Sequence, residues 1–252
     1  MGVALAVAVA VGVGVGVKVA VAVAVAVAVG VNVAVAVGVG VIVAAAVAVA
    51  VGARLLQRRG PANASRHPDN EHARREVGYG YYQLGNTLVE VGDYPAALES
   101  RRNAFAIRQE IAAQDPKNAQ AQFDLAVAHA DVSEALTGTG ATVEALNHAQ
   151  QSLSILQRLS TVDPTNAVYA RNMGLCYEKF ASAFEHLGSN ESSSNEQRIK
   201  DWTEARGWFE KASRLFSDLR DHGTLMPADS QQTTKFDRKI RQCDDAIAHL
   251  KR

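Results

Sequence analysis

The stretch Asp115-Pro116-Lys117-Asn118 follows His67-Pro68-Asp69-Asn70 by 48 residues and precedes Asp163-Pro164-Thr165-Asn166 by the same distance. In each stretch the proline blocks continuation of a preceding helix, and the asparagine two residues later can cap the next one. The same spacing separates Gly92 from Gly140. Self-similarity at a fixed period of this length is typical of stacked supersecondary units. The sequence therefore predicts a repeat fold.

Each 48-residue unit carries the pattern of two helices, and the units are predicted at about residues 67–114, 115–162 and 163–222. In the first unit, apolar residues recur at spacings of three and four, as they do on one face of a helix. Gly92 then ends this helix, because glycine adopts the left-handed stop conformation without a Cβ penalty. A second helix follows and ends at Asp115-Pro116. The apolar residues of the first helix are Val77, Tyr81, Leu84, Leu88 and Val91.

One ungapped segment resembles the tetratricopeptide repeat. It runs Tyr81-x-x-Leu84-Gly85-x-x-Leu88, then Gly92-Asp93-Tyr94-x-x-Ala97-Leu98, then Ala104-x-x-Ile107. Repeats of that family span about 34 residues, so each helix here is longer by about seven residues, or two turns. The chain therefore resembles bacterial versions of the repeat with lengthened helices. The resemblance implies an all-α superhelical stack of antiparallel helix pairs, with about three repeats and a C-terminal capping helix.

The third repeat departs from the period because it carries an insertion. The surplus falls at residues 189–200, and its small polar residues predict a long surface loop between the two helices. A final helix is predicted at 229–250, with Asp229 at its cap position. One face of this helix is apolar and the other heavily charged, as expected of a terminal unit that no further repeat covers.

Residues 1–52 form a low-complexity tract in which valine alternates with alanine or glycine almost without error. Strict alternation and abundant valine favour extended strands, which in water are prone to sheet aggregation. Residues 33–51 contain no charge and are followed by arginines, so they are also long enough for a membrane helix with a basic flank. Both interpretations stay open: a membrane span, or a translated DNA repeat that forms a disordered or sheet-prone tail.

Residues 53–66 form a predicted linker to a repeat domain at 67–252. If the span is real, its basic flank predicts a membrane-anchored protein with the repeat domain on the cytoplasmic side; the alternative is a cytoplasmic protein. The two cysteines, Cys176 and Cys243, fall on predicted inward helix faces, where free buried thiols are expected rather than a disulfide.

Motifs for chemistry are absent from the sequence. There is no phosphate-binding glycine loop, no nucleophile elbow and no zinc pair with ligand spacing. The formal net charge is +0, which gives no general attraction to nucleic acid. We therefore expect no enzyme activity, no metal and no cofactor, and instead a protein or peptide partner.

The resemblance implies a concave groove lined by the first helix of each repeat. The groove positions are Tyr79, Tyr82, Asn86 and Val89 in the first repeat, Val127, Ala130, Glu134 and Thr137 in the second, and Leu175, Glu178, Ser182 and Glu185 in the third. Six of them are the predicted binding residues: Tyr79, Tyr82, Asn86, Glu134, Glu178 and Glu185. Tyrosines at one end and acidic residues further along suit a ligand with apolar and basic groups.

Three functions stay open at this stage. The first is a non-catalytic adaptor, tethered to a membrane, whose groove recruits a protein partner. The second is a docking or sensory C-terminal part of a bacterial receptor-type serine/threonine kinase system, a setting in which lengthened repeats of this kind occur. The third is an enzyme on a helical scaffold, for which the sequence offers no catalytic constellation.

The N-terminal tract is predicted to govern where the protein is found. We expect the full-length chain to sediment with membranes and to resist extraction by high salt, because residues 33–51 would be buried in the bilayer. A chain reduced to residues 60–252 should stay in the soluble fraction. A soluble, monomeric full-length chain, or detergent-resistant β aggregates, would contradict the membrane interpretation.

Overall fold

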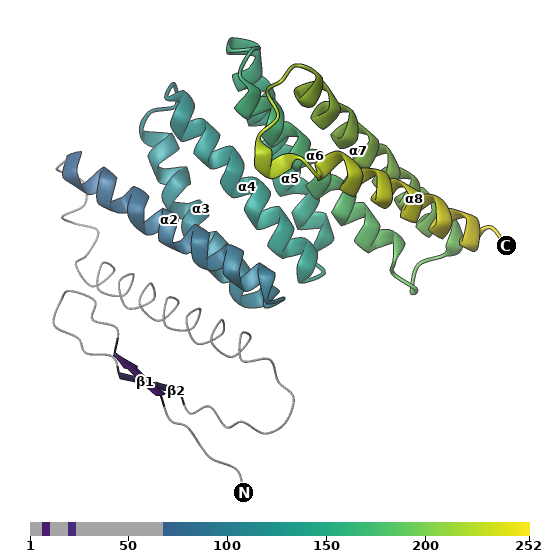
Figure 1. Ribbon diagram of the computed structural model, residues 1–252, viewed down its shortest axis with the longest axis horizontal. Coiled ribbons are helices and arrows are strands. Elements are labelled where there is room, and N and C mark those ends of the chain that lie inside the picture. The colour runs from purple at the N-terminus through teal and green to yellow at the C-terminus, as the bar shows by residue number, and fades with distance from the viewer. Residues whose placement is uncertain (1–6, 11–19, 24–67) are drawn as a thin grey trace, which may run out of the picture. The chain divides into compact units, whose positions relative to one another are not determined.

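The computed structural model describes residues 7–10, 20–23 and 68–252, and the last of these ranges is a row of α-helices (Figure 1). Successive helices pack against each other in pairs along the row. The prediction of an all-α stack of helix pairs is confirmed for residues 68–252. The helices are α2 (Pro68–Glu90), α3 (Tyr94–Gln114), α4 (Ala119–Gly138), α5 (Thr142–Val162), α6 (Ala167–Gly188), α7 (Asn195–Asp221) and α8 (Gln232–Leu250).

Short polar caps fix the helix ends, as the repeated motif predicts. The side-chain oxygen of Asn118 accepts a hydrogen bond from the backbone N–H of Ala121 at 3.1 Å. Asn166 does the same for Val168 at 3.1 Å. At the other end of the first helices, Gly92 and Gly140 have φ of 80° and 84°, a conformation that costs other residues a Cβ clash. The sequence signals are therefore confirmed at Asn118, Asn166, Gly92 and Gly140. Asn70 does not lie at a cap position of its helix, because α2 already begins at Pro68.

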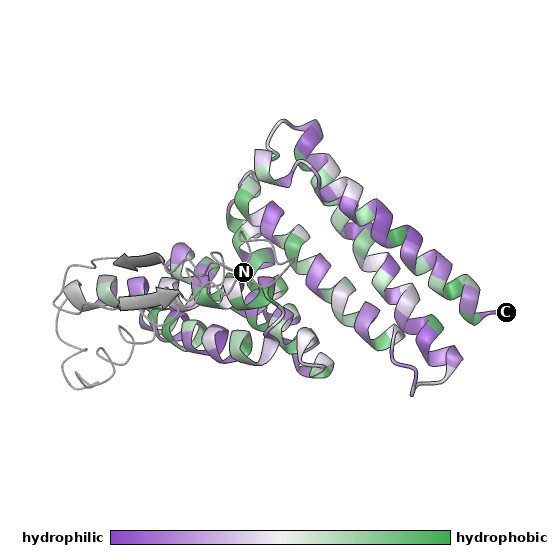
Figure 2. Ribbon diagram, turned by 60° about the horizontal axis from the view of Figure 1, so that its bottom comes forward, coloured by the Kyte–Doolittle hydropathy of each residue, from purple (hydrophilic) through white to green (hydrophobic). Residues whose placement is uncertain are grey.

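Small residues let the paired helices approach closely. Ala97, Ala145 and Ala205 occupy the same place in the second helix of each repeat, and all three are 0% exposed. The third repeat adds large aromatic side chains, because Phe209 and Phe216 of α7 pack with Phe236 of α8. Figure 2 shows hydrophobic and hydrophilic residues alternating along the helices, as amphipathic packing requires.

The inserted loop is shorter than predicted. It covers residues 189–194, whereas residues 195–200 already form the first turns of α7. Ser194 caps this helix by accepting a hydrogen bond from the N–H of Gln197 at 3.2 Å, and Lys200 pairs with Glu196 at 2.9 Å one turn apart. The sequence of a polar helix start therefore resembles that of a loop, because helix-capping and ion-pairing residues are of the same polar types that are common in loops.

The prediction that Asp229 caps the terminal helix is also wrong. Asp229 lies in a short 3₁₀ turn, η2 (Pro227–Asp229), and α8 begins three residues later. Its carboxylate is 2% exposed and receives two hydrogen bonds from Arg171 of α6, at 2.5 and 2.9 Å. The predicted amphipathic character of the terminal helix is confirmed: Phe236 and Cys243 are buried, and Asp237, Arg238 and Arg241 are exposed.

In the N-terminal tract the structure describes two strands, β1 (Val7–Ala10) and β2 (Ala20–Val23). They pair antiparallel, with Val7 opposite Val23. The predicted membrane span at 33–51 and the predicted linker at 53–66 lie outside the described residues. Among the helices that are described, none combines the length and the apolar character needed to cross a bilayer. Residues 68–252 form a compact unit of their own.

The helix-pair contact gives a stability prediction. Ala97→Leu and Ala145→Leu should each lower the free energy of unfolding by about 1–3 kcal/mol, because both sites are filled. The matched control is Ala113→Leu, at an exposed position of the same helix as Ala97, which should change it by less than about 0.5 kcal/mol. Urea unfolding measures the difference, and equal effects at buried and exposed sites would show that the repeat register is misassigned.

Candidate functional site

The six predicted binding residues lie on the first helices of the repeats, but the structure divides them into two groups. Glu134 of α4 and Glu178 and Glu185 of α6 line one cavity of about 480 Å³. Tyr79 of α2 lines a second cavity of about 230 Å³. Tyr82 and Asn86 line neither cavity.

A buried arginine connects Asn86 with the first of the acidic residues. Arg101 of α3 is 3% exposed, and its guanidinium pairs with Glu134 at 2.7 Å. It also donates to the side-chain oxygen of Asn86 at 3.4 Å and to the backbone carbonyl of Asp131. Lys179 of α6 binds the other oxygen of Glu134 at 2.8 Å. Glu134 thus joins the first repeat to the third.

The other two acidic residues are paired by the terminal helix. Lys235 of α8 lies 2.6 Å from Glu178, and Lys239 lies 2.7 Å from Glu185. We call the connected side chains of the first helices and their partners the polar strip. Its members are Asn86, Arg101, Glu134, Glu178, Lys179, Glu185, Lys235 and Lys239.

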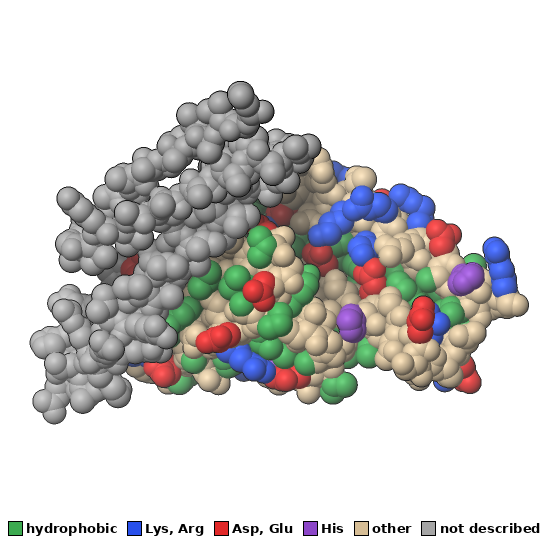
Figure 3. All heavy atoms as spheres, turned by 90° about the horizontal axis from the view of Figure 1, so that it is seen from below, with side chains coloured by type: hydrophobic (Ala, Val, Ile, Leu, Met, Phe, Trp, Pro, Cys, Tyr) green, Lys and Arg blue, Asp and Glu red, His purple; other side chains and the backbone are tan. Residues whose placement is uncertain are grey.

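This pairing changes the expected ligand chemistry. Each predicted acidic residue already holds a cation of the same chain within 2.6–2.8 Å. A basic ligand would have to displace those cations, so the three carboxylates do not form an open acidic surface. Charges of both signs also mix elsewhere on the exposed face that Figure 3 shows.

The pKa of Glu134 reflects the same arrangement. Burial alone would raise the pKa of this carboxyl, because it disfavours the charged form. The ion pairs with Lys179 and Arg101 outweigh burial and lower the pKa from 4.5 to about 2. The ion pairs of the polar strip therefore involve the ionised form of Glu134.

The tyrosine group forms the other part of the site. Tyr79 is 53% exposed, and its ring centroid lies 6.1 Å from that of Tyr82. The guanidinium of Arg108 lies over the Tyr82 ring, 5.2 Å from its centroid, a cation–π arrangement. Gln83 donates to the Tyr79 hydroxyl at 2.7 Å. The outcome is an exposed aromatic surface whose edge is held by polar contacts.

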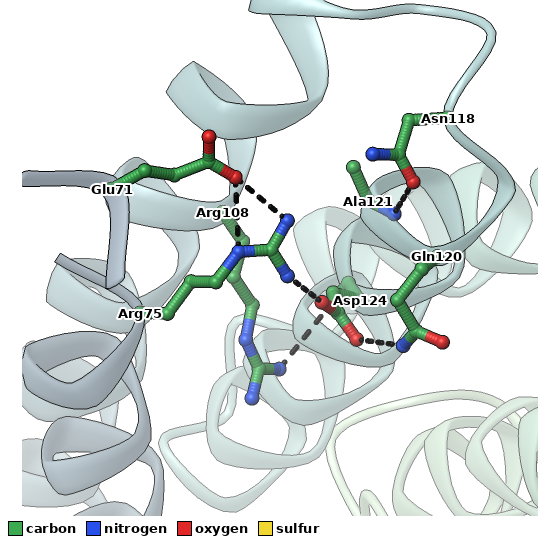
Figure 4. Close-up of polar contacts among 7 residues, drawn as sticks. All are labelled: Glu71, Arg75, Arg108, Asn118, Gln120, Ala121 and Asp124. Carbon is green, nitrogen blue, oxygen red and sulfur yellow. Dashed lines mark hydrogen bonds and ion pairs between the residues drawn. The ribbon is translucent and has the colours of Figure 1, made fainter. Parts of the chain in front are cut away.

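Ion pairs join α2, α3 and α4 beside these tyrosines (Figure 4). Arg75 of α2 bridges Glu71 at 2.9 Å and Asp124 of α4 at 3.3 Å. Arg108 of α3 donates to the backbone carbonyl of Asp124 at 3.4 Å. Ile107 and Ile111 give the small cavity at this point an apolar wall. A ligand side chain that enters this cavity would contact both apolar carbon atoms and arginine side chains.

The cationic members of the site were not predicted from the sequence. One signal was available for Arg101, because the 48-residue period aligns it with Ala149, which is 0% exposed. A charged residue on an apolar stripe indicates a buried partner. Lys235 and Lys239 gave no such signal, since both belong to the charged part of an amphipathic helix.

The described residues offer no group of three His, Cys, Asp or Glu side chains placed to hold a metal ion. Burial raises the pKa of both Cys176 and Cys243 to about 12, so neither thiol ionises near neutral pH. Both cysteines are free and buried, which confirms that prediction.

The helix pairs and the fixed period define the chain as a helical repeat protein. The sequence matches no protein-family profile and no curated protein. Similar solved structures include the de novo designed helical repeat protein DHR64, at 12% identity and a TM-score of 0.34, covering 83% of this chain and 94% of that one. BtubC (BKLC) from P. vanneervenii is 17% identical with a TM-score of 0.35, covering 83% and 88%. The DHF58 filament is 11% identical with a TM-score of 0.32, covering 83% and 96%. These similarities concern the fold alone.

The polar strip gives a stability prediction with a defined pH dependence. Glu134→Gln keeps the shape of the side chain but leaves Arg101 and Lys179 without their carboxylate, so we expect a loss of about 2 kcal/mol at pH 7. The exposed Glu90 provides a control, and Glu90→Gln should cost less than about 0.5 kcal/mol.

The sign of the pH effect follows from the lowered pKa of Glu134. The contribution of the ionised carboxylate should be complete above about pH 4.5 and disappear as the pH falls towards about 2. Urea unfolding at several pH values should therefore show wild type and Glu134→Gln converging in acid. A constant difference would mean that the charge of Glu134 is not what stabilises the fold.

Proposed function

We propose that this chain is a non-catalytic scaffold of the tetratricopeptide type, which binds an extended segment of a protein partner along α2, α4 and α6. The observation that carries this proposal is the cavity of about 480 Å³, to which α4 and α6 contribute side chains from equivalent positions of successive repeats. Glu134 and Ser182 are 48 residues apart, and Thr137 and Glu185 are as well. A surface built by repetition suits a ligand that is itself a repeating main chain.

The chemistry of the lining favours a partner of low net charge. The carboxylates of the cavity hold cations of the same chain, so a charged segment would compete with existing pairs instead of filling an empty site. Ser182 and Thr137 add hydroxyl groups to the lining, and His186 adds an imidazole. These groups suit backbone amides and carbonyls of an extended peptide.

The tyrosine group supports an apolar or aromatic anchor at one end of the segment. Tyr79 is largely exposed, and Tyr82 is held by Arg108 above its ring. Aromatic and arginine side chains are the types that most often dominate the energy of an interface. The segment we propose has an apolar or aromatic residue at this end and polar, uncharged residues where it reaches α6.

The experiment is a selection of peptides from a random library on the immobilised full-length chain. Enriched peptides should carry an aromatic or large aliphatic residue and little net charge. Tyr82→Ala should weaken their binding by about 2 kcal/mol, or roughly 30-fold in Kd, because it removes a groove aromatic. The control is Val143→Ala, at a 73% exposed position of α5, which should leave Kd unchanged.

Two results would contradict the proposal. Enrichment of lysine- and arginine-rich peptides whose affinity falls steeply with salt would mean that the acidic residues are available after all. Binding that survives Tyr82→Ala but disappears when residues 189–194 are replaced by glycine and serine would place the site on the inserted loop.

A further inference from the structure

Two histidines of the second repeat meet away from the polar strip. Nδ1 of His129 in α4 lies 3.0 Å from Nδ1 of His148 in α5. Phe105 of α3 lies edge-on to both rings, with centroids 4.7 Å from His129 and 5.6 Å from His148. Because Phe105 belongs to the first repeat, this His129–His148–Phe105 cluster spans the joint between the first two repeats.

The surroundings of the cluster are apolar on one side and charged on the other. Phe105 packs against the core formed by Val132 and Leu136. The charged groups facing His148 are Arg102 of α3 and Glu144 of α5, which pair with each other at 3.1 Å. Both of these side chains are about half exposed, so water screens their effect.

The contact between the rings constrains their protonation. One Nδ1 must donate its proton and the other must accept it, so at least one ring has to be neutral. Two imidazolium rings would set two N–H donors and two like charges against each other beside Phe105. No third His, Cys, Asp or Glu completes a metal site here among the described residues, so a hydrogen bond accounts for the close approach.

We propose that the His129–His148–Phe105 cluster is an acid-sensitive latch, which holds α4 and α5 of the second repeat together against Phe105 of the first repeat and opens when both rings are protonated. The third repeat has a separate aromatic core, built from α6, α7 and α8, that includes neither histidine. Because the protonated rings would repel each other across the α4–α5 contact, acid should loosen α4 from α5, and with them the seat of Phe105 of α3, before it loosens α6 and α7.

The pH range follows from the direction of the shifts. Burial and, as a smaller cause, the neighbouring His148 together lower the pKa of His129 from 6.5 to about 4. Burial also lowers the pKa of His148, which Glu144 counteracts and Arg102 reinforces. The unfolded chain takes up these protons more readily than the folded one. The latch is therefore intact above about pH 6.5 and weakens as the pH falls towards about 4.

Hydrogen exchange of the full-length chain, read by mass spectrometry at pH 7 and pH 5, tests the latch. After correction for the intrinsic pH dependence of exchange, amides of α4 and α5 should exchange about tenfold faster at pH 5, those of α3 less so, while those of α6 and α7 change little. His148→Gln can still donate and accept a hydrogen bond but carries no charge, so it should remove most of this acceleration. His249→Gln, at an exposed position of α8, should behave like wild type.

Equal acceleration in wild type and His148→Gln would overturn the proposal, and so would acceleration spread evenly from α2 to α8. If His148→Gln disturbs the fold at pH 7, NMR titration of the wild-type rings decides instead. Coupled titration of His129 and His148 well below pH 6.5 supports the latch. Independent titration of both near pH 6.5 rules it out.

Discussion

The close approach of the two helices in each repeat is the constraint on which the rest of the structure depends. Ala97, Ala145 and Ala205 have no exposed surface, so the crossing leaves room for a methyl group and little more. An alanine recurs at this place in every repeat. Of the first helices, α4 packs against α6, and Arg75 of α2 pairs with Asp124 of α4. Side chains at equivalent positions of α4 and α6 line one cavity, so this part of the candidate site is a consequence of core packing.

A single departure from this regular core shapes the candidate site. Arg101 stands where the second repeat has Ala149, and it is almost fully buried. A buried guanidinium is tolerated only when it is paired, because leaving a charge unpaired in the interior costs several kcal/mol. Glu134 supplies the pair, and Lys179 balances its second oxygen. The acidic residues therefore stabilise the fold through these ion pairs. Their charge is already balanced, so they would not favour a strongly basic ligand.

The repeats differ in how they are held together. The third repeat and α8 share buried phenylalanines, whereas the joint between the first two repeats carries polar groups on two sides of α4. Asp131, whose backbone carbonyl meets Arg101, and His129 are two residues apart and so point about 200° away from each other. Polar contacts depend on protonation in a way that phenylalanine packing does not. The first repeat, which carries the tyrosine group, is thus joined to the rest of the stack by contacts that are more polar than those of the third repeat.

The sequence by itself determined the helix pairs, most of their ends and the buried cysteines. These features depend on residues three or four positions apart or on the repeat period, both of which are visible in a linear chain. Only the tertiary structure decided the length of the inserted loop, the burial of Asp229 and the partners of the acidic residues. Lys235 and Lys239 lie 57 and 54 residues from Glu178 and Glu185, so nothing local connects them. The ion pairs that form depend on how α8 packs on the stack. Apolar contacts such as those of Phe236 set that packing, and they do not depend on which charged side chains come together.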